Sequence, residues 1–164
     1  MPNWNRIKKL RDYLVAEEAD AKKKLKRAEF RKFNMRKWLT ITSGKLKNGG
    51  ETTLGTIRKN GPSCGRATCL AGDAFILFAK SHIRLTALKS GTVISPVLFI
   101  DDEASRLLGL TDSESGFVFY GNWNTSSKSG NLLAGASRER AIKYLTRAIN
   151  EKNIFVMWNG STLE

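Results

Sequence analysis

The sequence has little of the residue types that build disulfide frameworks and metal sites. Its 164 residues include two cysteines, one histidine and three prolines. Two cysteines are too few for a disulfide framework, and the opening segment MPNWNRIKKLRDYL lacks the apolar stretch of a secretory signal. No apolar run approaches the roughly 18 residues needed to cross a bilayer. We therefore expect a cytoplasmic protein with reduced thiols and no membrane partner.

Both cysteines lie in the segment NGPSCGRATCLAGDA, as Cys64 and Cys69. A structural zinc ion needs four Cys or His ligands, and His82 is the only histidine available, so we expect no metal and no cofactor. A catalytic thiol at Cys64 would need His82 as its base. The helix predicted below would hold these two side chains roughly 20 Å apart at a rise of about 1.5 Å per residue. We therefore expect no enzyme, and assign the small residues of this segment to close packing in the core.

Charge is the most pronounced feature of the composition, and it is unevenly distributed. The formal net charge is +13. Residues 1–60 carry 17 Lys or Arg against 6 Asp or Glu, whereas residues 61–164 carry 11 against 9. A basic region joined to a nearly neutral one points to a polyanionic partner.

The basic charge is densest between residues 22 and 37, where Glu29 is the single acid. The segment contains Lys22, Lys23, Lys24, Lys26, Arg27, Arg31, Lys32, Arg36 and Lys37. A second cluster consists of Lys45, Lys47, Arg58 and Lys59. Phe30, Phe33 and Trp38 are interleaved with or follow the first cluster, and such rings can stack on unpaired bases. Because cations this dense repel one another, we expect them to bind an anion.

Nucleic acid is the partner that we predict, with these Lys and Arg side chains neutralising phosphates. The chain has no zinc finger, no RNA-recognition-motif sequence and no convincing helix-turn-helix, so we expect binding to the backbone without sequence readout. The sequence leaves open whether the partner is DNA, RNA or an acidic protein surface.

Periodicity predicts a mainly α (α+β) fold, a small helical domain with a few short strands. Residues 1–164 are expected to form a single domain, with a basic N-terminal helix within 1–38 and a globular core at 60–158. Asn3 caps the first helix, and no Gly or Pro interrupts it up to Phe33. The other predicted elements are a buried helix at 66–80, a strand-like segment at 92–100, short helices after Asp101 and Thr111, a helix at 138–151 and a strand at 154–158.

Three segments resemble a set of small phage and bacterial proteins. These segments are FNMRKW at 33–38, CGRATCLAGDA and EASRLLGLTDSESGFVFY. In that family a Phe-Asp-Met segment with a nearby Trp precedes Cys-Gly-Thr-x-x-Cys-x-Ala-Gly and a Leu-Gly-Leu helix. Asn34, Arg66 and Asp73 depart from this pattern. The resemblance implies no named activity. It suggests the alternative of a phage-encoded inhibitor or adaptor that binds an acidic surface of a host protein or defence complex in the host cytoplasm.

Overall fold

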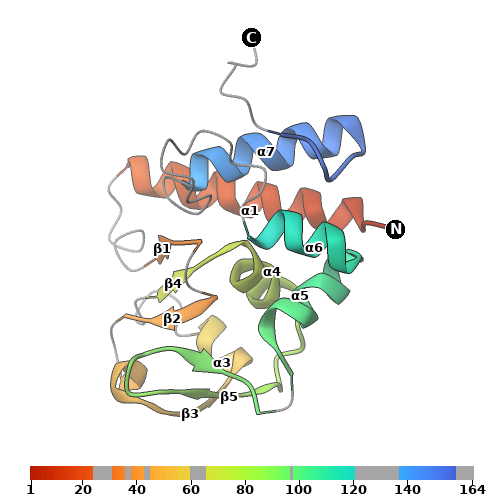
Figure 1. Ribbon diagram of the computed structural model, residues 1–164. Coiled ribbons are helices and arrows are strands. Elements are labelled where there is room, and N and C mark those ends of the chain that lie inside the picture. Colours follow the sequence, from red (N-terminus) through yellow and green to blue (C-terminus); the bar gives the residue numbers. More distant parts are fainter. Residues whose placement is uncertain are drawn as a thin grey trace.

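The computed structural model describes residues 1–23, 31–35, 38–42, 45–59, 66–96, 98–120 and 137–157, with the backbone alone at 31, 32, 45, 47, 66 and 67 (Figure 1). Its helices are α1 (Trp4–Lys22), the 3-10 helix η1 (Lys45–Asn48), α3 (Leu54–Lys59), α4 (Leu70–Phe78), α5 (Ile100–Leu108), α6 (Asp112–Phe119) and α7 (Arg138–Glu151). Its strands are β1 (Arg31–Phe33), β2 (Leu39–Ile41), β3 (Gly50–Thr53), β4 (Arg66–Thr68), β5 (Arg84–Ala87) and β6 (Val93–Ile94). The predicted mainly helical α+β fold with a long N-terminal helix is confirmed.

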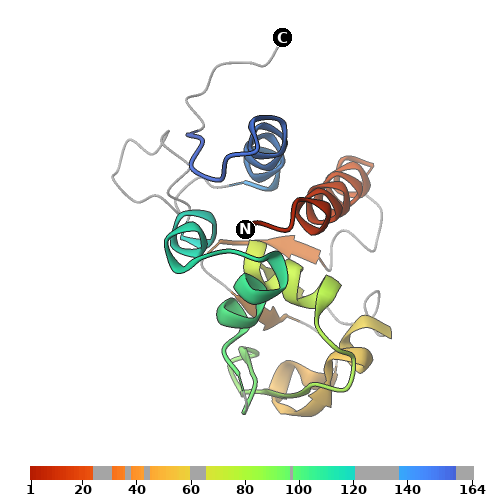
Figure 2. The same ribbon diagram turned by 90° about the vertical axis from the view of Figure 1, so that its right-hand side faces the viewer.

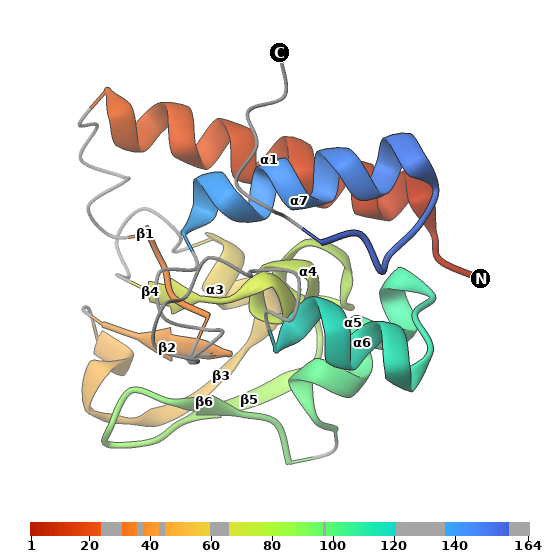
Figure 3. The ribbon, with the colours of Figure 1, turned by 45° about the horizontal axis from the view of Figure 1, so that its top comes forward.

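Helices α1 and α7 pack against each other as an antiparallel pair, which lies side by side in Figures 1 and 3. Asn3 Oδ1 accepts a hydrogen bond from the backbone N–H of Arg6 at 3.1 Å, which caps the start of α1 as the sequence predicted. The start of α7 lies at the end of α1, where Arg138 Nη1 is 3.8 Å from Glu18 Oε2. The apolar stripe of α1 is fully buried against α7 and its neighbours, through Ile7, Leu10 and Leu14. Helix α1 is therefore part of the core and lies along the body of the protein.

The N-terminal helix is shorter than predicted. It ends at Lys22, and residues 31–33 form strand β1, which pairs in parallel with β4. The prediction of one helix through Phe33 is therefore wrong. Phe33 lies opposite Thr68 in the ladder and packs on the core, so pairing with a distant strand overrides the helical pattern of the sequence. Residues 24–30 lie outside the described residues.

The strands form two small sheets, with strand orders β1-β4-β2 and β3-β5-β6. In the described part of the chain, the Thr40–Thr92 bridge joins β2 of the first sheet to the start of β6 in the second. The Ile41 N–H donates to the Gly91 carbonyl oxygen at 2.8 Å beside this bridge. One cluster of buried residues lies between these strands and α4, and a second lies between α4 and the α1–α7 pair.

Helix α4 lies at the centre, with every residue from Leu70 to Ile76 buried, as predicted for a central helix. Its predicted start at residue 66 is wrong, because residues 66–68 are strand β4 and the helix begins after Cys69. The Thr68 hydroxyl donates to Asp73 Oδ1 at 2.6 Å and ties the strand to the helix. A Cβ atom on Gly72 would overlap the carbonyl oxygen of Trp38, so the glycine allows the chain entering β2 to touch α4.

The C-terminal half follows its local sequence signals closely. Helix α5 begins at Ile100 and has Phe99 as its N-cap, so the predicted start after Asp101 is wrong. It stops at Gly109, which has φ 67°, and α6 begins with a capping box between Thr111 and Glu114. Ser137 caps α7, whose bounds match the predicted helix. The predicted terminal strand is wrong across its described residues 154–157, which form no strand. The segment packs instead by side chains, and the buried Tyr144 hydroxyl donates to the Ile154 carbonyl at 2.9 Å.

Candidate nucleic-acid interface

The described candidate cations are distributed over four elements. Lys22 ends α1 and Lys23 follows it, Arg31 and Lys32 lie in β1, Lys45 and Lys47 lie in η1, and Arg58 and Lys59 end α3. Lys24, Lys26, Arg27, Arg36 and Lys37 lie outside the described residues.

Three of these elements share one end of the molecule. The C-terminal end of α1, strand β1 and η1 all lie toward the left in Figures 1 and 3. Helices α5 and α6 lie on the opposite side, which faces the viewer in Figure 2. The first turns of these two helices carry Asp101, Asp102, Glu103, Asp112 and Glu114. These five acids thus lie across the molecule from the candidate cations of α1, β1 and η1, whereas Glu18 and Glu139 lie beside Lys22. We refer to the end with α1, β1 and η1 as the basic end.

Lys22 and Lys23 point into solvent at the basic end. The Lys22 side chain is 67% exposed, and its Nζ lies 4.0 Å from Glu18 Oε1, a long and weak ion pair. Lys23 is exposed, and within the described residues no carboxylate lies in ion-pair range of its ammonium group. The chain's own acids therefore leave the positive charge at this helix end largely available.

Strand pairing places two arginines side by side at the basic end. Arg31 of the edge strand β1 is directly opposite Arg66 of β4. Neighbouring strands lie only about 4.8 Å apart, so the backbone positions of these two arginines are adjacent. The sequence analysis did not select Arg66, because its closeness to Arg31 depends on a pairing between residues 35 positions apart.

Lys89 is a second cation that the sequence analysis did not select. Gly49, which follows η1 with φ 101°, packs so closely on the turn between β5 and β6 that an added Cβ would lie 3.2 Å from the Ala87 carbonyl oxygen and 3.5 Å from Lys89 N. The exposed Lys89 therefore lies in the turn that packs on Gly49, which is two residues after Lys47. No local pattern in the sequence signals this contact.

Arg58 has a structural role. Its guanidinium donates to the carbonyl oxygens of Ile76 at 2.5 Å and Ala79 at 2.6 Å, and to the Ser81 hydroxyl at 2.8 Å. These contacts satisfy carbonyl groups at the C-terminal end of α4, where a helix favours positive charge. Partial burial lowers the pKa of Arg58. The side chain is thus occupied within the fold, unlike the exposed Lys59 beside it.

The cysteine segment shows no catalytic geometry in its described part. Cys69 is fully buried, and burial raises the pKa of its thiol to about 12, so it is protonated at neutral pH. His82 is exposed, and Cys64 lies outside the described residues. Among the residues that the structure describes, no three His, Cys, Asp or Glu side chains are grouped to hold a metal ion. That the protein is not an enzyme stays a prediction.

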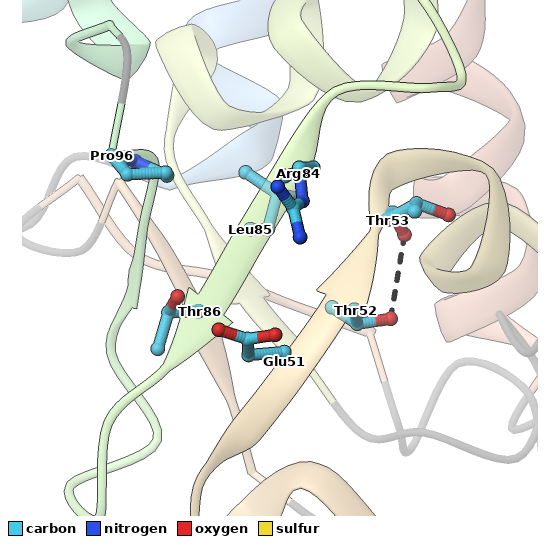
Figure 4. Close-up of a pocket in the computed structure, with 7 residues that line it drawn as sticks. All are labelled: Glu51, Thr52, Thr53, Arg84, Leu85, Thr86 and Pro96. Carbon is cyan, nitrogen blue, oxygen red and sulfur yellow. Dashed lines mark hydrogen bonds between the residues drawn. The ribbon is translucent and has the colours of Figure 1, made fainter.

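An open hollow of about 490 Å³ lies over the paired strands β3 and β5 (Figure 4). Its polar surface includes Glu51, Thr53, Arg84 and Thr86. Because Glu51 contributes a negative charge beside Arg84, this surface is less suited to phosphate than the basic end.

Comparisons with known proteins assign no family. No protein-family profile, no curated protein and no solved structure matches the chain. Within the described ranges, no helix combines the length and apolarity required to span a membrane.

Proposed function

We propose that this protein binds nucleic acid through the phosphate backbone, using its basic end. The observation that carries the proposal is the exposure of Lys22 and Lys23 at the same end as the Arg31–Arg66 register pair, in a molecule of net charge +13. The acids of α5 and α6 lie on the other side, so the field of the protein orients a polyanion toward the basic end.

The proposed contacts include the predicted cations and two that the fold adds, Arg66 and Lys89. Arg58 is excluded because its donors are used within the fold. The set is Lys22, Lys23, Lys24, Lys26, Arg27, Arg31, Lys32, Arg36, Lys37, Lys45, Lys47, Lys59, Arg66 and Lys89. Each phosphate that these side chains neutralise releases condensed counterions, so the affinity depends steeply on salt and little on base sequence.

A matched pair of charge reversals tests the proposal. Lys22 and Lys23 lie at the basic end, whereas Lys8 and Lys9 are exposed lysines near the start of the same helix. The double variants Lys22→Glu/Lys23→Glu and Lys8→Glu/Lys9→Glu make the same change in net charge. We expect the first to weaken binding to random DNA and RNA at least about 10-fold more than the second. It should also flatten the plot of log affinity against log salt by about 0.7–0.9 for each phosphate that the variant no longer neutralises.

Fluorescence anisotropy between roughly 50 and 200 mM salt measures both quantities. A similar weakening in the two variants would show that total charge, and not the basic end, controls binding. Undetectable binding to DNA and RNA at roughly 50 mM salt would contradict the proposal. In that case, capture of one host protein after nuclease treatment would favour the inhibitor or adaptor alternative.

A further inference from the structure

A second hollow opens where strands β2 and β6 separate beyond the Thr40–Thr92 bridge. It has a volume of about 320 Å³, which falls in the size range of small-ligand pockets. Its lining includes Trp38, directly before β2, and Thr92 and Ile94. Phe99 and Asp101, at the start of α5, complete the principal lining. We refer to this hollow as the fork pocket.

Two aromatic residues line the fork pocket: Trp38, which packs against Tyr120, and Phe99, which is mostly exposed. The Trp38 ring packs edge-on against Tyr120 with a centroid distance of 5.8 Å, and the Trp38 carbonyl lies against Gly72 of the central helix. These contacts hold the indole in place. Phe99 is 76% exposed and Ile94 is 45% exposed, so both offer apolar surface to a ligand. A flat aromatic ligand suits such a lining, because it can stack on rings and exclude water.

One exposed cation, Lys89, lies near the Thr92 part of the fork pocket lining, and the first turn of α5 carries acids at another part. Lys89 is in the turn that leads into β6, three residues before Thr92. At no more than about 3.3 Å per residue, the distance from Lys89 to the pocket is that of roughly one or two nucleotides. On the α5 side, Glu103 is held by Arg106 through two hydrogen bonds of 2.7 Å, which leaves Asp101 and Asp102 as the nearby acids. A phosphate chain is therefore favoured along the Lys89 side, with its bases directed toward the pocket.

We infer that the fork pocket binds one unstacked nucleobase of a single-stranded nucleic acid whose phosphates contact the basic end. This inference rests on the proposed function. The Asp101 carboxylate lines the pocket and can only accept hydrogen bonds when ionised, so it favours a base with an exocyclic amino group. Cytosine offers the two protons of its amino group, whereas thymine offers only its N3–H. The pocket thus selects single strands over duplexes and cytosine over thymine.

Binding of three short probes of equal length separates the base from the phosphates. The probes are oligo-dC, oligo-dT and an abasic oligomer that carries the same phosphates without bases, each titrated by anisotropy at roughly 50 mM salt. Because stacking of one base on an aromatic side chain strengthens binding about 5- to 150-fold, we expect oligo-dC to bind at least about 10-fold more tightly than the abasic oligomer. Oligo-dT should lie between the two.

Phe99→Ala is the informative variant, because the ring is mostly exposed and its removal leaves the core intact. It should weaken oligo-dC binding at least about 5-fold, toward the affinity of the abasic oligomer, and leave the abasic affinity unchanged. Phe155→Ala removes a half-exposed ring outside the fork pocket and serves as the control, with no change expected. Asp101→Asn should remove the preference for oligo-dC over oligo-dT. Circular dichroism confirms that each variant is folded.

The outcomes distinguish the two proposals. Equal binding of oligo-dC and the abasic oligomer would overturn the fork pocket as a base site while supporting backbone binding. A ratio of oligo-dC to abasic affinity that is unchanged in Phe99→Ala would place the base elsewhere and overturn the inference. No binding of any probe would contradict the proposed function itself.

Discussion

Gly72 fixes how closely the chain that enters β2 approaches the central helix. Glycine in a helix interior costs roughly 1 kcal/mol relative to alanine, so the sequence predicted a packing reason for it. The reason is the carbonyl oxygen of Trp38, which occupies the space of a Cβ atom. The same contact fixes the backbone of Trp38, which lines the fork pocket, so the missing side chain at Gly72 helps to position Trp38.

Gly72→Ala should therefore destabilise the protein by roughly 2 kcal/mol or more, in spite of the better helix propensity of alanine. Gly116 in α6 is the matched control, since an added Cβ there meets nothing within 4 Å. Gly116→Ala should leave stability unchanged or raise it by up to about 1 kcal/mol. Urea denaturation of both variants measures the difference, and similar changes in the two would show that the contact with Trp38 yields easily.

Arg58 and Lys59 show what a count of charges cannot resolve. The two residues are adjacent in the sequence, and the charge pattern predicts the same role for both. One donates to the C-terminal end of α4, and the other is exposed. The difference depends on where Ile76 and Ala79 lie in the fold, and the sequence near residue 58 contains no signal of this.

Among the elements, helix α5 contains the Arg106–Glu103 ion pair, whose contribution to stability depends on pH. Hydrogen bonds from Arg106 hold the pKa of Glu103 below its ordinary value. Because the pKa of Glu103 is lower in the folded than in the unfolded protein, the ion pair contributes fully to stability above the unfolded pKa of about 4.3. This contribution is lost as the pH falls through the folded pKa. The pair should thus stabilise the protein at neutral pH and lose this effect in acid.

Arg106→Gln should lower the urea midpoint near pH 7 and have a progressively smaller effect as the pH falls and Glu103 becomes protonated in the folded protein. Midpoints measured as the pH is lowered provide the test. A difference that stays constant with pH would assign the role of Arg106 to packing instead of charge.

The sequence predicted those elements whose boundaries are encoded locally. Gly109, the Thr111–Glu114 capping box and Ser137 all act within a few residues, and α5, α6 and α7 begin or end where these signals lie. Strands β1 and β4 were missed because each is three residues long and is defined by pairing with the other. Their segments also lack the alternation that identifies longer strands. Contacts between residues that are distant in the sequence therefore determine the elements that local sequence patterns did not predict.

At the scale of the whole molecule, the net charge of +13 produces repulsion that folding must overcome. Salt screens this repulsion, with a Debye length of about 10 Å at 0.1 M. We expect the Tm of the free protein to rise by a few degrees between roughly 20 and 300 mM NaCl, since about 1 kcal/mol corresponds to roughly 2–4 °C for a chain of this size. Scanning fluorimetry measures this shift.

With saturating single-stranded DNA, the dependence on salt should be reversed. Binding to the folded state raises the Tm at low salt, and the increase should shrink as salt weakens the complex. A Tm of the free protein that falls with salt would indicate that the described surface charges are largely compensated. The net charge and its concentration in residues 1–60 were predictable from the sequence, whereas the fork pocket required residues 38, 92–95 and 98–101 to meet in space.

The narrow connection between the two sheets includes a backbone amide whose hydrogen exchange can report a ligand in the fork pocket. The Ile41 amide is bonded to Gly91 beside the Thr40–Thr92 bridge, at the point from which the strands diverge. The amide proton can exchange with solvent only when this hydrogen bond opens. A ligand wedged between the strands would therefore change the exchange rate at one backbone position in the interior, and occupancy could be followed there without any label on the ligand.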